Sequence, residues 1–233
     1  MDLMTAGYAF LAGILPPLIW LYLLLKEDAK HPEPKSLIAL TFAAGMVAVP
    51  LVLPFEQAAV ARFSGEVPLL FSWALIEEVA KYAAVALVVL WRPAVDEPID
   101  YVIYMLTAAL GFAALENTLF IFGPFEHGQV IAGLATGNLR FMGSTLVHVI
   151  SSSALGFSMA FTYRKAVYRR MSGAAVGLIL AVGLHGFFNF LILSAGGSLT
   201  LLAFFLVWTA ALVIFAFFEV LQYRESHRAR ATS

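Results

Sequence analysis

The sequence predicts an all-α fold, a polytopic bundle of about seven transmembrane helices. Two observations support this fold class. The 233 residues are 61% hydrophobic and 12% charged, with a mean hydropathy of +0.88, which lies far outside the range of soluble globular proteins. The apolar residues are also gathered in successive stretches, each long enough to cross a bilayer as a helix.

The composition excludes several classes of function. With a formal net charge of -1 and no basic block, the chain offers nucleic acid no electrostatic surface to bind. Cysteine is absent, which excludes disulfides, thiolate metal sites and a cysteine nucleophile. The oligomeric state stays open, because helix faces that meet partners and faces that meet lipid are both apolar.

The spanning stretches cover, in order, residues 4–25, 36–55, 69–91, 100–122, 139–163, 172–194 and 198–222. The opening MDLMTAG has no Lys or Arg, so the first stretch is expected to be a retained helix and not a cleavable signal. Residues 124–138 hold too few apolar residues to cross and are interrupted by glycines, which indicates a re-entrant or interfacial piece. No soluble domain or internal repeat is evident, so residues 1–233 are expected to form a single membrane-embedded domain.

The distribution of basic residues predicts the orientation. If the amino terminus lies outside, the inner side receives eleven of them, namely Lys26, Lys30, Lys35, Arg92, Arg164, Lys165, Arg169, Arg170, Arg224, Arg228 and Arg230. The outer side receives Arg62 and Arg140, and Lys81 lies within the membrane. Since cytoplasmic loops carry the excess of Lys and Arg, the sequence predicts an outer amino terminus and an inner carboxyl terminus.

The stretch 69–91 differs from the others because charged residues stand at its centre. Glu77, Glu78 and Lys81 would together cost about 8 to 10 kcal/mol to insert into lipid, at roughly 2.5 to 3.5 kcal/mol each. Other helices must therefore surround this one. Lys81 follows Glu78 by three residues and Glu77 by four, so its ammonium can reach either carboxylate on one side of the helix.

Four more polar residues lie in the predicted spans: Glu116, His148, His185 and Asn189. His185 and Asn189 share a helix face, because they are four residues apart. At about 1.5 Å of rise per residue, Glu77, Glu116 and both histidines lie roughly 9 to 15 Å below the outer surface. Unrelated structural residues would have no reason to share a depth, so the sequence predicts one polar site in the outer half of the bundle.

These residue types are those of a hydrolytic metal site. Glu116, His148 and His185 can supply three oxygen and nitrogen ligands to zinc and leave a fourth position for water. A metal-free mechanism, in which a glutamate activates the water directly, uses the same residues. No residue decides between the two.

The paired glutamates suit the role of proton acceptor. A carboxylate of Glu77 or Glu78 can take the proton of the attacking water, and the sequence leaves open which of the two does so. Asn189 can donate a hydrogen bond to the oxyanion that forms. Lys81 can keep the acidic pair ionised and oriented.

Two functions of other classes use the same residues. Carboxylate and imidazole relays also mark the pathways of proton-coupled transporters. Against transport, the halves of the chain show no inverted repeat, and the polar groups form one layer instead of a path to the inner face. A non-catalytic membrane scaffold is the remaining alternative.

Three motifs resemble a known family. EEVAK at 77–81 matches an EExxK motif, FAALE at 112–116 an FxxxE motif, and HGFFN at 185–189 an HxxxN-like motif. In this order on successive helices, together with HPEPKSL at 31–37, they resemble the PrsW family of intramembrane proteases over most of the chain. That family is distantly similar to the CAAX prenyl endopeptidases and the bacterial immunity-type membrane proteases.

The resemblance implies a peptidase in a prokaryotic cell membrane that cleaves a membrane-anchored protein, such as an anti-sigma factor, near the outer leaflet. By motif position it implies that Glu77 and Glu78 are catalytic, and that Glu116 and His185 belong to the same centre. The CAAX endopeptidases carry His where Glu116 stands and Arg where Lys81 stands, so the resemblance does not imply a prenylated substrate.

Overall fold

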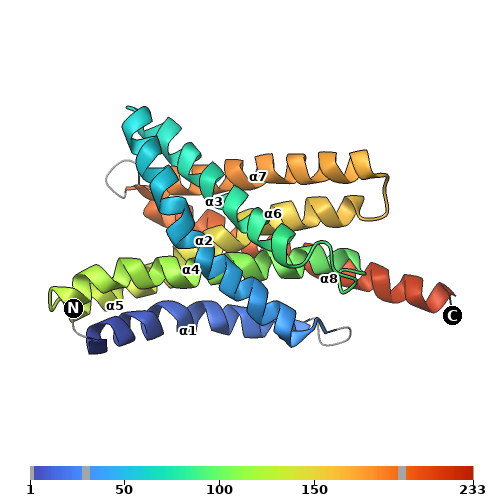
Figure 1. The fold of residues 1–233 in the computed structure, drawn as a ribbon, viewed down its shortest axis with the longest axis horizontal. Coiled ribbons are helices and arrows are strands. Elements are labelled where there is room, and N and C mark those ends of the chain that lie inside the picture. Colours follow the sequence, from blue (N-terminus) through green and yellow to red (C-terminus); the bar gives the residue numbers. More distant parts are fainter. Residues whose placement is uncertain (1–2, 28–31, 194–197, 233) are drawn as a thin grey trace.

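The computed structural model describes residues 3–27, 32–193 and 198–232, and these are almost entirely helical (Figure 1). The α-helices are α1 (Leu3–Glu27), α2 (Lys35–Arg62), α3 (Glu66–Val88), α4 (Pro98–Glu126), α5 (Val130–Leu139), α6 (Thr145–Thr162), α7 (Val167–Leu193) and α8 (Thr200–Thr232). A short π-helical segment, η1 (Arg140–Ser144), joins α5 to α6 without a break. No strand occurs in the described residues, which confirms the predicted all-α fold.

The helices are long and apolar enough to form a polytopic membrane bundle. Six of the described helical runs meet the length and hydropathy that a membrane span requires, with α5, η1 and α6 forming one of them. The seventh run is α3, whose 23 residues include the central charges of Glu77, Glu78 and Lys81. The protein is therefore a multi-pass membrane protein, as the sequence predicts.

Successive runs alternate in direction. Figure 1 shows the amino terminus and the turns after α2 and α4 at one end of the bundle, with the ends of α1, α3 and α6 and the carboxyl terminus at the other. This alternation is the condition on which the orientation from basic residues depends. Lys30 and the side chains of Arg224, Arg228 and Arg230 lie outside the described part of the chain. Which end faces the cytoplasm stays a prediction.

The sequence indicates a separate re-entrant or interfacial piece over residues 124–138, but in the structure these residues belong to the end of α4, a turn and α5, which continues into η1 and α6. The chain turns at Gly128, whose φ of 70° suits glycine, and α5 then packs back against the end of α4. Gly133, which reads as a break in the sequence, lets α5 approach the ring of Phe125. The fifth run therefore extends over Val130–Thr162 and has 33 residues.

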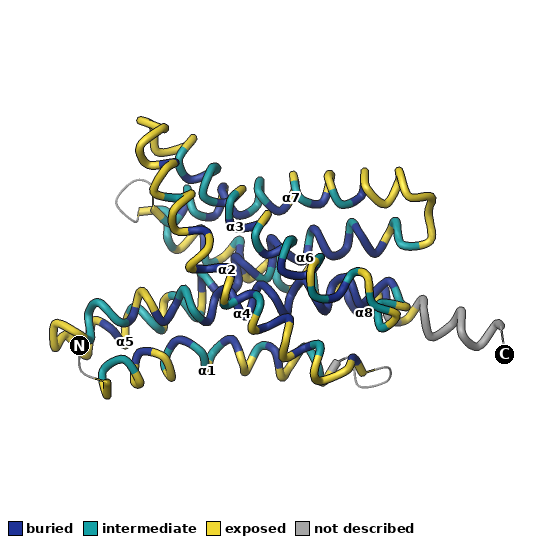
Figure 2. The backbone as a smooth tube through the Cα atoms, in the orientation of Figure 1, coloured by how far each residue is buried: buried dark blue, intermediate teal, exposed yellow. Residues whose placement is uncertain are grey.

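α4 forms the centre of the bundle. Every residue from Pro98 to Ala114 is buried, and Figure 2 shows this buried backbone in the middle of the molecule. The helix begins with a capping box between Glu97 and Asp100 and with a proline in its first turn. A helix that is apolar on all sides must be covered by other elements, and α1, α2 and α6 cover this one.

α2 crosses α4 at close range, because a glycine on each helix meets the backbone of the other. A Cβ atom at Gly45 would overlap the carbonyl oxygen of Ala108, and one at Gly111 would overlap that of Phe42. The following turns of α2 then pack against Phe112 of α4. This crossing sets α2 beside the stretch of α4 that leads to Glu116.

The loop before α2 is tied to the opposite end of α4. Glu33 is buried and accepts a hydrogen bond from the hydroxyl of Tyr104. His31, the first residue of the loop motif, lies outside the described residues. The contact fixes where α2 begins relative to the central helix.

Candidate functional site

α3 turns its three charged residues toward the interior of the bundle. Nζ of Lys81 lies 2.8 Å from Oε1 of Glu78 and 3.4 Å from Oε2 of Glu77, as their spacing along the helix predicts. The side chains of Glu78 and Lys81 are fully buried, and that of Glu77 is 8% exposed. Helices α2, α4, α6 and α7 all contact α3, so other helices surround it as the insertion cost requires.

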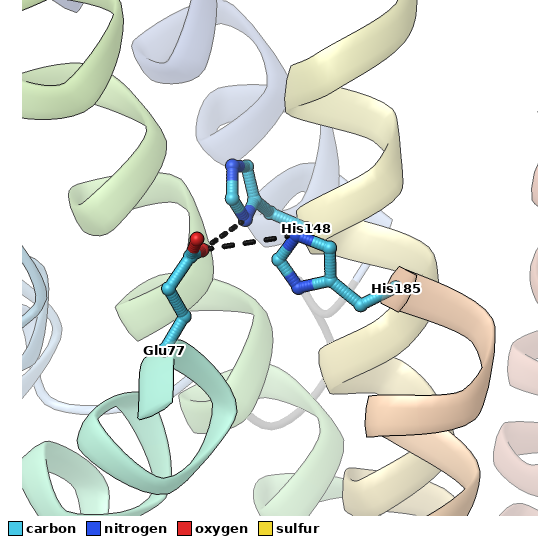
Figure 3. A group of neighbouring side chains, drawn as sticks. All are labelled: Glu77, His148 and His185. Carbon is cyan, nitrogen blue, oxygen red and sulfur yellow. Dashed lines mark ion pairs between the residues drawn. The ribbon is translucent and has the colours of Figure 1, made fainter. Parts of the chain in front are cut away.

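Glu77 meets two histidines that come from α6 and α7 (Figure 3). Its Oε2 atom lies 3.7 Å from Nδ1 of His148 and 3.7 Å from Nε2 of His185. The two imidazole rings stand almost perpendicular, with centroids 5.0 Å apart. One oxygen and two nitrogen atoms lie within 4.8 Å of one another, and all three residues are buried. These are the donor types that hold zinc in hydrolytic sites.

A second carboxylate stands behind each histidine. Nδ1 of His185 lies 2.9 Å from Oε1 of Glu78, and Nε2 of His148 lies 2.9 Å from Oε2 of Glu116. Because an ionised carboxylate only accepts hydrogen bonds, a neutral imidazole donates its N–H there and keeps a lone pair on its other nitrogen. These other nitrogen atoms, Nδ1 of His148 and Nε2 of His185, are the ones that lie 3.7 Å from Glu77. Carboxylates in this position orient metal-binding histidines.

Lys81 and Ser152 complete the hydrogen bonds of this group. Nζ of Lys81 lies 2.8 Å from Nδ1 of His148 and 4.4 Å from the centroid of the Phe112 ring. An ammonium only donates, so Nδ1 of His148 accepts, which agrees with the tautomer above. The hydroxyl of Ser152 donates to Oε2 of Glu78 at 2.8 Å. Both oxygens of Glu78 therefore have donors inside the protein.

The polar group opens on a pocket of about 440 Å³. Five of the predicted site residues line it: Glu77, Glu116, His148, His185 and Asn189. Apolar side chains of α2, α3, α4 and the end of α7 also line it, among them Val52 and Ile192. Glu78 lies behind this lining with no exposed side-chain surface. The structure thus separates the two neighbouring glutamates, since Glu77 faces the pocket and Glu78 faces the interior.

All seven predicted site residues lie in this cluster or on its pocket, although not in the grouping the sequence suggested. Glu77 is the carboxylate that stands with the two histidines. Glu116 lies on the other side of the His148 ring and contacts its outer nitrogen. Asn189 lies one turn beyond His185 on α7 and reaches the same pocket.

Two charged pocket residues were not among the predicted site residues. Nη2 of Arg140 lies 2.5 Å from Oε2 of Glu116, and Glu56 of α2 lines the pocket. Arg140 therefore lies within the helical run Val130–Thr162, although the count of basic residues placed it on the outer side. The sequence does hold one indication of Arg140. The span of Glu116 offers no cation at helical spacing, so its buried carboxylate needs a basic partner from another helix.

The buried group holds more acidic than basic side chains. It contains the carboxyl groups of Glu77, Glu78 and Glu116 and two basic side chains, those of Lys81 and Arg140. A buried charge without a counter-charge is costly. A bound cation between Glu77 and the histidines would therefore stabilise this group.

The sequence of this chain is similar to those of a known family of proteins. The family described as PrsW family intramembrane metalloprotease matches residues 33–220. The protein named Protease PrsW from Geobacillus kaustophilus is 28% identical over 189 residues, which cover 78% of this chain and 79% of that protein. The protein of the same name from Oceanobacillus iheyensis is 27% identical, over 86% of this chain and 91% of that protein. The one from Bacillus subtilis is 28% identical, over 78% of this chain and 81% of that protein. No solved structure matches the chain significantly.

Proposed function

We propose that this chain, which belongs to the PrsW family of intramembrane metalloproteases and is therefore an intramembrane protease, cleaves a membrane-anchored protein. We place the cleavage in the pocket that Glu77 lines. Family membership decides among the three functions left open by the sequence, in favour of proteolysis. We further propose that residues 1–233 act as one peptidase domain in a bacterial cell membrane.

The observation that carries this proposal is the meeting of Glu77, His148 and His185 at the pocket. They come from α3, α6 and α7 and bring one oxygen and two nitrogen atoms within 4.8 Å of one another. A peptide drawn into the pocket would have its backbone beside these atoms. The apolar wall suits the side chains of a membrane-spanning substrate.

The donor set and the excess of acidic over basic side chains fit a divalent metal, for which we propose zinc. Glu77, His148 and His185 would hold it, and Lys81 would give up its contact with Nδ1 of His148 while keeping that with Glu78. When bound, zinc polarises a carbonyl and lowers the pKa of a bound water to about 7. We assign Glu116 to the orientation of His148, in place of the ligand role that the sequence suggested.

In the hydrolysis, Glu77 is the glutamate that can reach a water molecule in the pocket. Its Oε2 atom faces both imidazoles, so Oε1 is the atom we assign to accepting the proton of the attacking water. The side-chain amide of Asn189 donates to the oxyanion from the same pocket. Glu78 and Lys81 act by holding His185 and Glu77 in place.

The substrate we propose is a single-span protein of the anti-sigma-factor type. The pocket is lined by residues near the end of α2 and the end of α7, among them Glu56 and Leu193. Figure 1 shows these two helix ends on the same side of the bundle as the amino terminus, which is the outer side in the predicted orientation. A bond near the extracytoplasmic end of the substrate helix would enter the pocket without crossing the bilayer centre. We therefore expect cleavage at that end.

The proposal is tested with purified protein in liposomes that contain a single-span reporter, whose fragments are identified by mass spectrometry. The variant Glu77→Gln keeps the size of the side chain but cannot accept a proton, so cleavage should fall about 10²- to 10⁴-fold. Glu66→Gln, the same change at an exposed position in the first turn of α3, is the matched control and should cleave normally.

Measuring the metal content tests the role of Glu77 and the role of zinc separately. The wild-type protein should hold zinc, and the variants Glu77→Gln and His185→Gln should lose it. A Glu77→Gln variant that cleaves at the wild-type rate would rule out this active site. A fully active protein stripped of metal would instead leave Glu77 as a metal-free base and remove zinc from the mechanism.

A further inference from the structure

The side chain of Arg140 contacts three residues of α4: Glu116, Asn117 and Phe120. Its Nη2 lies 2.5 Å from Oε2 of Glu116, and its Nε lies 2.6 Å from Oδ1 of Asn117. The guanidinium plane is covered by the ring of Phe120, with 3.9 Å between the guanidinium carbon and the ring centroid. Asn117 is fixed in turn by Thr145, at 3.0 Å. The side chain of Arg140 is 14% exposed, so these contacts define its position.

Arg140 and His148 share a single atom of Glu116. The Oε2 oxygen accepts from Nη2 of Arg140 and also stands 2.9 Å from Nε2 of His148. If Arg140 is removed, the Glu116 side chain, which is 20% exposed and opens on the pocket, has no cation to hold it. Nε2 of His148 then has no fixed acceptor, so the ring is oriented only from the Lys81 side, where Nζ donates to Nδ1 at 2.8 Å. A metal bound at Nδ1 would displace that contact and leave neither nitrogen of the ring held by a neighbouring side chain.

The π-helical segment explains how Arg140 and His148 reach the same oxygen. The two residues are eight positions apart, which in a regular α-helix separates them by about 80° around the axis. A π-helical turn takes up one extra residue and about 100° of rotation, which leaves only about 20°. Both side chains therefore point toward α4. Such turns occur frequently at functional sites.

We propose that Arg140 is a positioning residue of the metal site, which acts through Glu116 to keep the lone pair of His148 directed at Glu77. The proposal rests on the proposed function, because it assumes that His148 binds the metal. It assigns Arg140 to metal binding and not to contact with the substrate. Its loss should weaken metal affinity even in the absence of any substrate.

The test measures metal binding by the full-length protein in detergent. Metal-free protein is titrated with Zn²⁺ against a chelating dye, and with Co²⁺ by visible absorption. The variant Arg140→Gln should raise the Kd for Zn²⁺ about 10- to 100-fold, as loss of a partner behind a ligand does, and should alter the Co²⁺ spectrum. Arg62→Gln changes an exposed arginine at the end of α2, so it is the matched control and should alter neither.

Arg140→Lys is the second variant, and it keeps the positive charge in case the glutamine variant does not fold. A lysine can contact Glu116 but lacks the planar fork that also reaches Asn117. Its Kd should therefore fall between those of wild type and Arg140→Gln, and a Kd equal to that of Arg140→Gln would contradict the proposal. The melting temperature of each variant shows that the protein is folded.

Two results would overturn the proposal, and they are distinguishable from each other. If the wild type binds zinc and a folded Arg140→Gln binds it equally well with the same Co²⁺ spectrum, Arg140 does not position His148. A loss of cleavage in that variant would then indicate a role at the substrate. If the wild-type protein binds neither metal, the metal site of the proposed function fails, and the role of Arg140 fails with it.

Discussion

Nδ1 of His185 lies 2.9 Å from Oε1 of Glu78. This contact gives the second of two adjacent glutamates a role different from that of the first. Successive residues of a helix point about 100° apart, so Glu78 is turned toward α6 and α7 while Glu77 remains on the pocket. In the proposed mechanism, the motif EEVAK thus holds one carboxylate for chemistry and one that orients a histidine.

The variant Glu78→Gln should weaken the site without removing it. A glutamine can still accept the hydrogen bond from His185, but it lacks the negative charge that favours this tautomer and balances Lys81. We expect the Kd for Zn²⁺ to rise about 10- to 100-fold, with cleavage recovering when zinc is added in excess. Cleavage by Glu77→Gln should not recover at any zinc concentration, and equal recovery in both variants would refute the division of roles.

Lys81 should be essential for stability. The variant Lys81→Met leaves the buried carboxylates of Glu77 and Glu78 without their cation, which should cost about 3 to 5 kcal/mol of unfolding free energy. Denaturant unfolding in detergent micelles measures the loss. Adding Glu78→Gln to this variant should restore part of the stability, because one uncompensated charge is then removed. Lys35→Met, at an exposed position, serves as the control and should change little.

The close crossing of α2 and α4 should not tolerate a methyl group. Gly45→Ala would place Cβ against the carbonyl oxygen of Ala108, so the helices must separate, at a cost of about 1 to 3 kcal/mol. The same change at Gly183 of α7 meets open space and should be neutral or stabilising, since alanine favours helix. Melting temperatures in micelles compare the two variants. Equal effects would mean that the crossing does not depend on Gly45.

Zinc should stabilise the folded protein. A ligand that binds only the native state at 100 times its Kd adds about 2.7 kcal/mol of stability, so the melting temperature should rise with zinc and fall again with a chelator. His185→Gln should abolish this shift. The control His127→Gln changes an exposed histidine at the end of α4 and should retain it. A shift that persists in His185→Gln would place the zinc elsewhere.

The sequence predicted the bundle and most members of the site, because both follow from the cost of polar groups in lipid. The charges of Glu77, Glu78 and Lys81 required a surrounded helix, and the structure surrounds α3. The shared depth of Glu116, His148 and His185 indicated one site, and their side chains do lie in one cluster. These inferences used position along the helix axis, which counting residues supplies.

The sequence does not predict in which direction around its helix each of these side chains points. This direction decides that Glu77 lies between the two histidines while Glu116 contacts His148 from its other side, and that Glu78 faces inward. The extra residue in η1 also has no signature in the sequence, so the contact between Arg140 and Glu116 could not be derived. Within residues 124–138, Gly128 does turn the chain, but Gly133 proved to be a point of close packing against Phe125, because a small residue favours a helix contact as readily as a turn.

The three groups around the pocket come from helices that are made at different times. A ribosome that has finished α6 has already produced Glu77 and His148, yet the chain holds no His185 until most of α7 follows. A nascent chain shorter than 185 residues therefore lacks the complete set. In the proposed mechanism, the ability to cleave would arise only after most of α7 has been made.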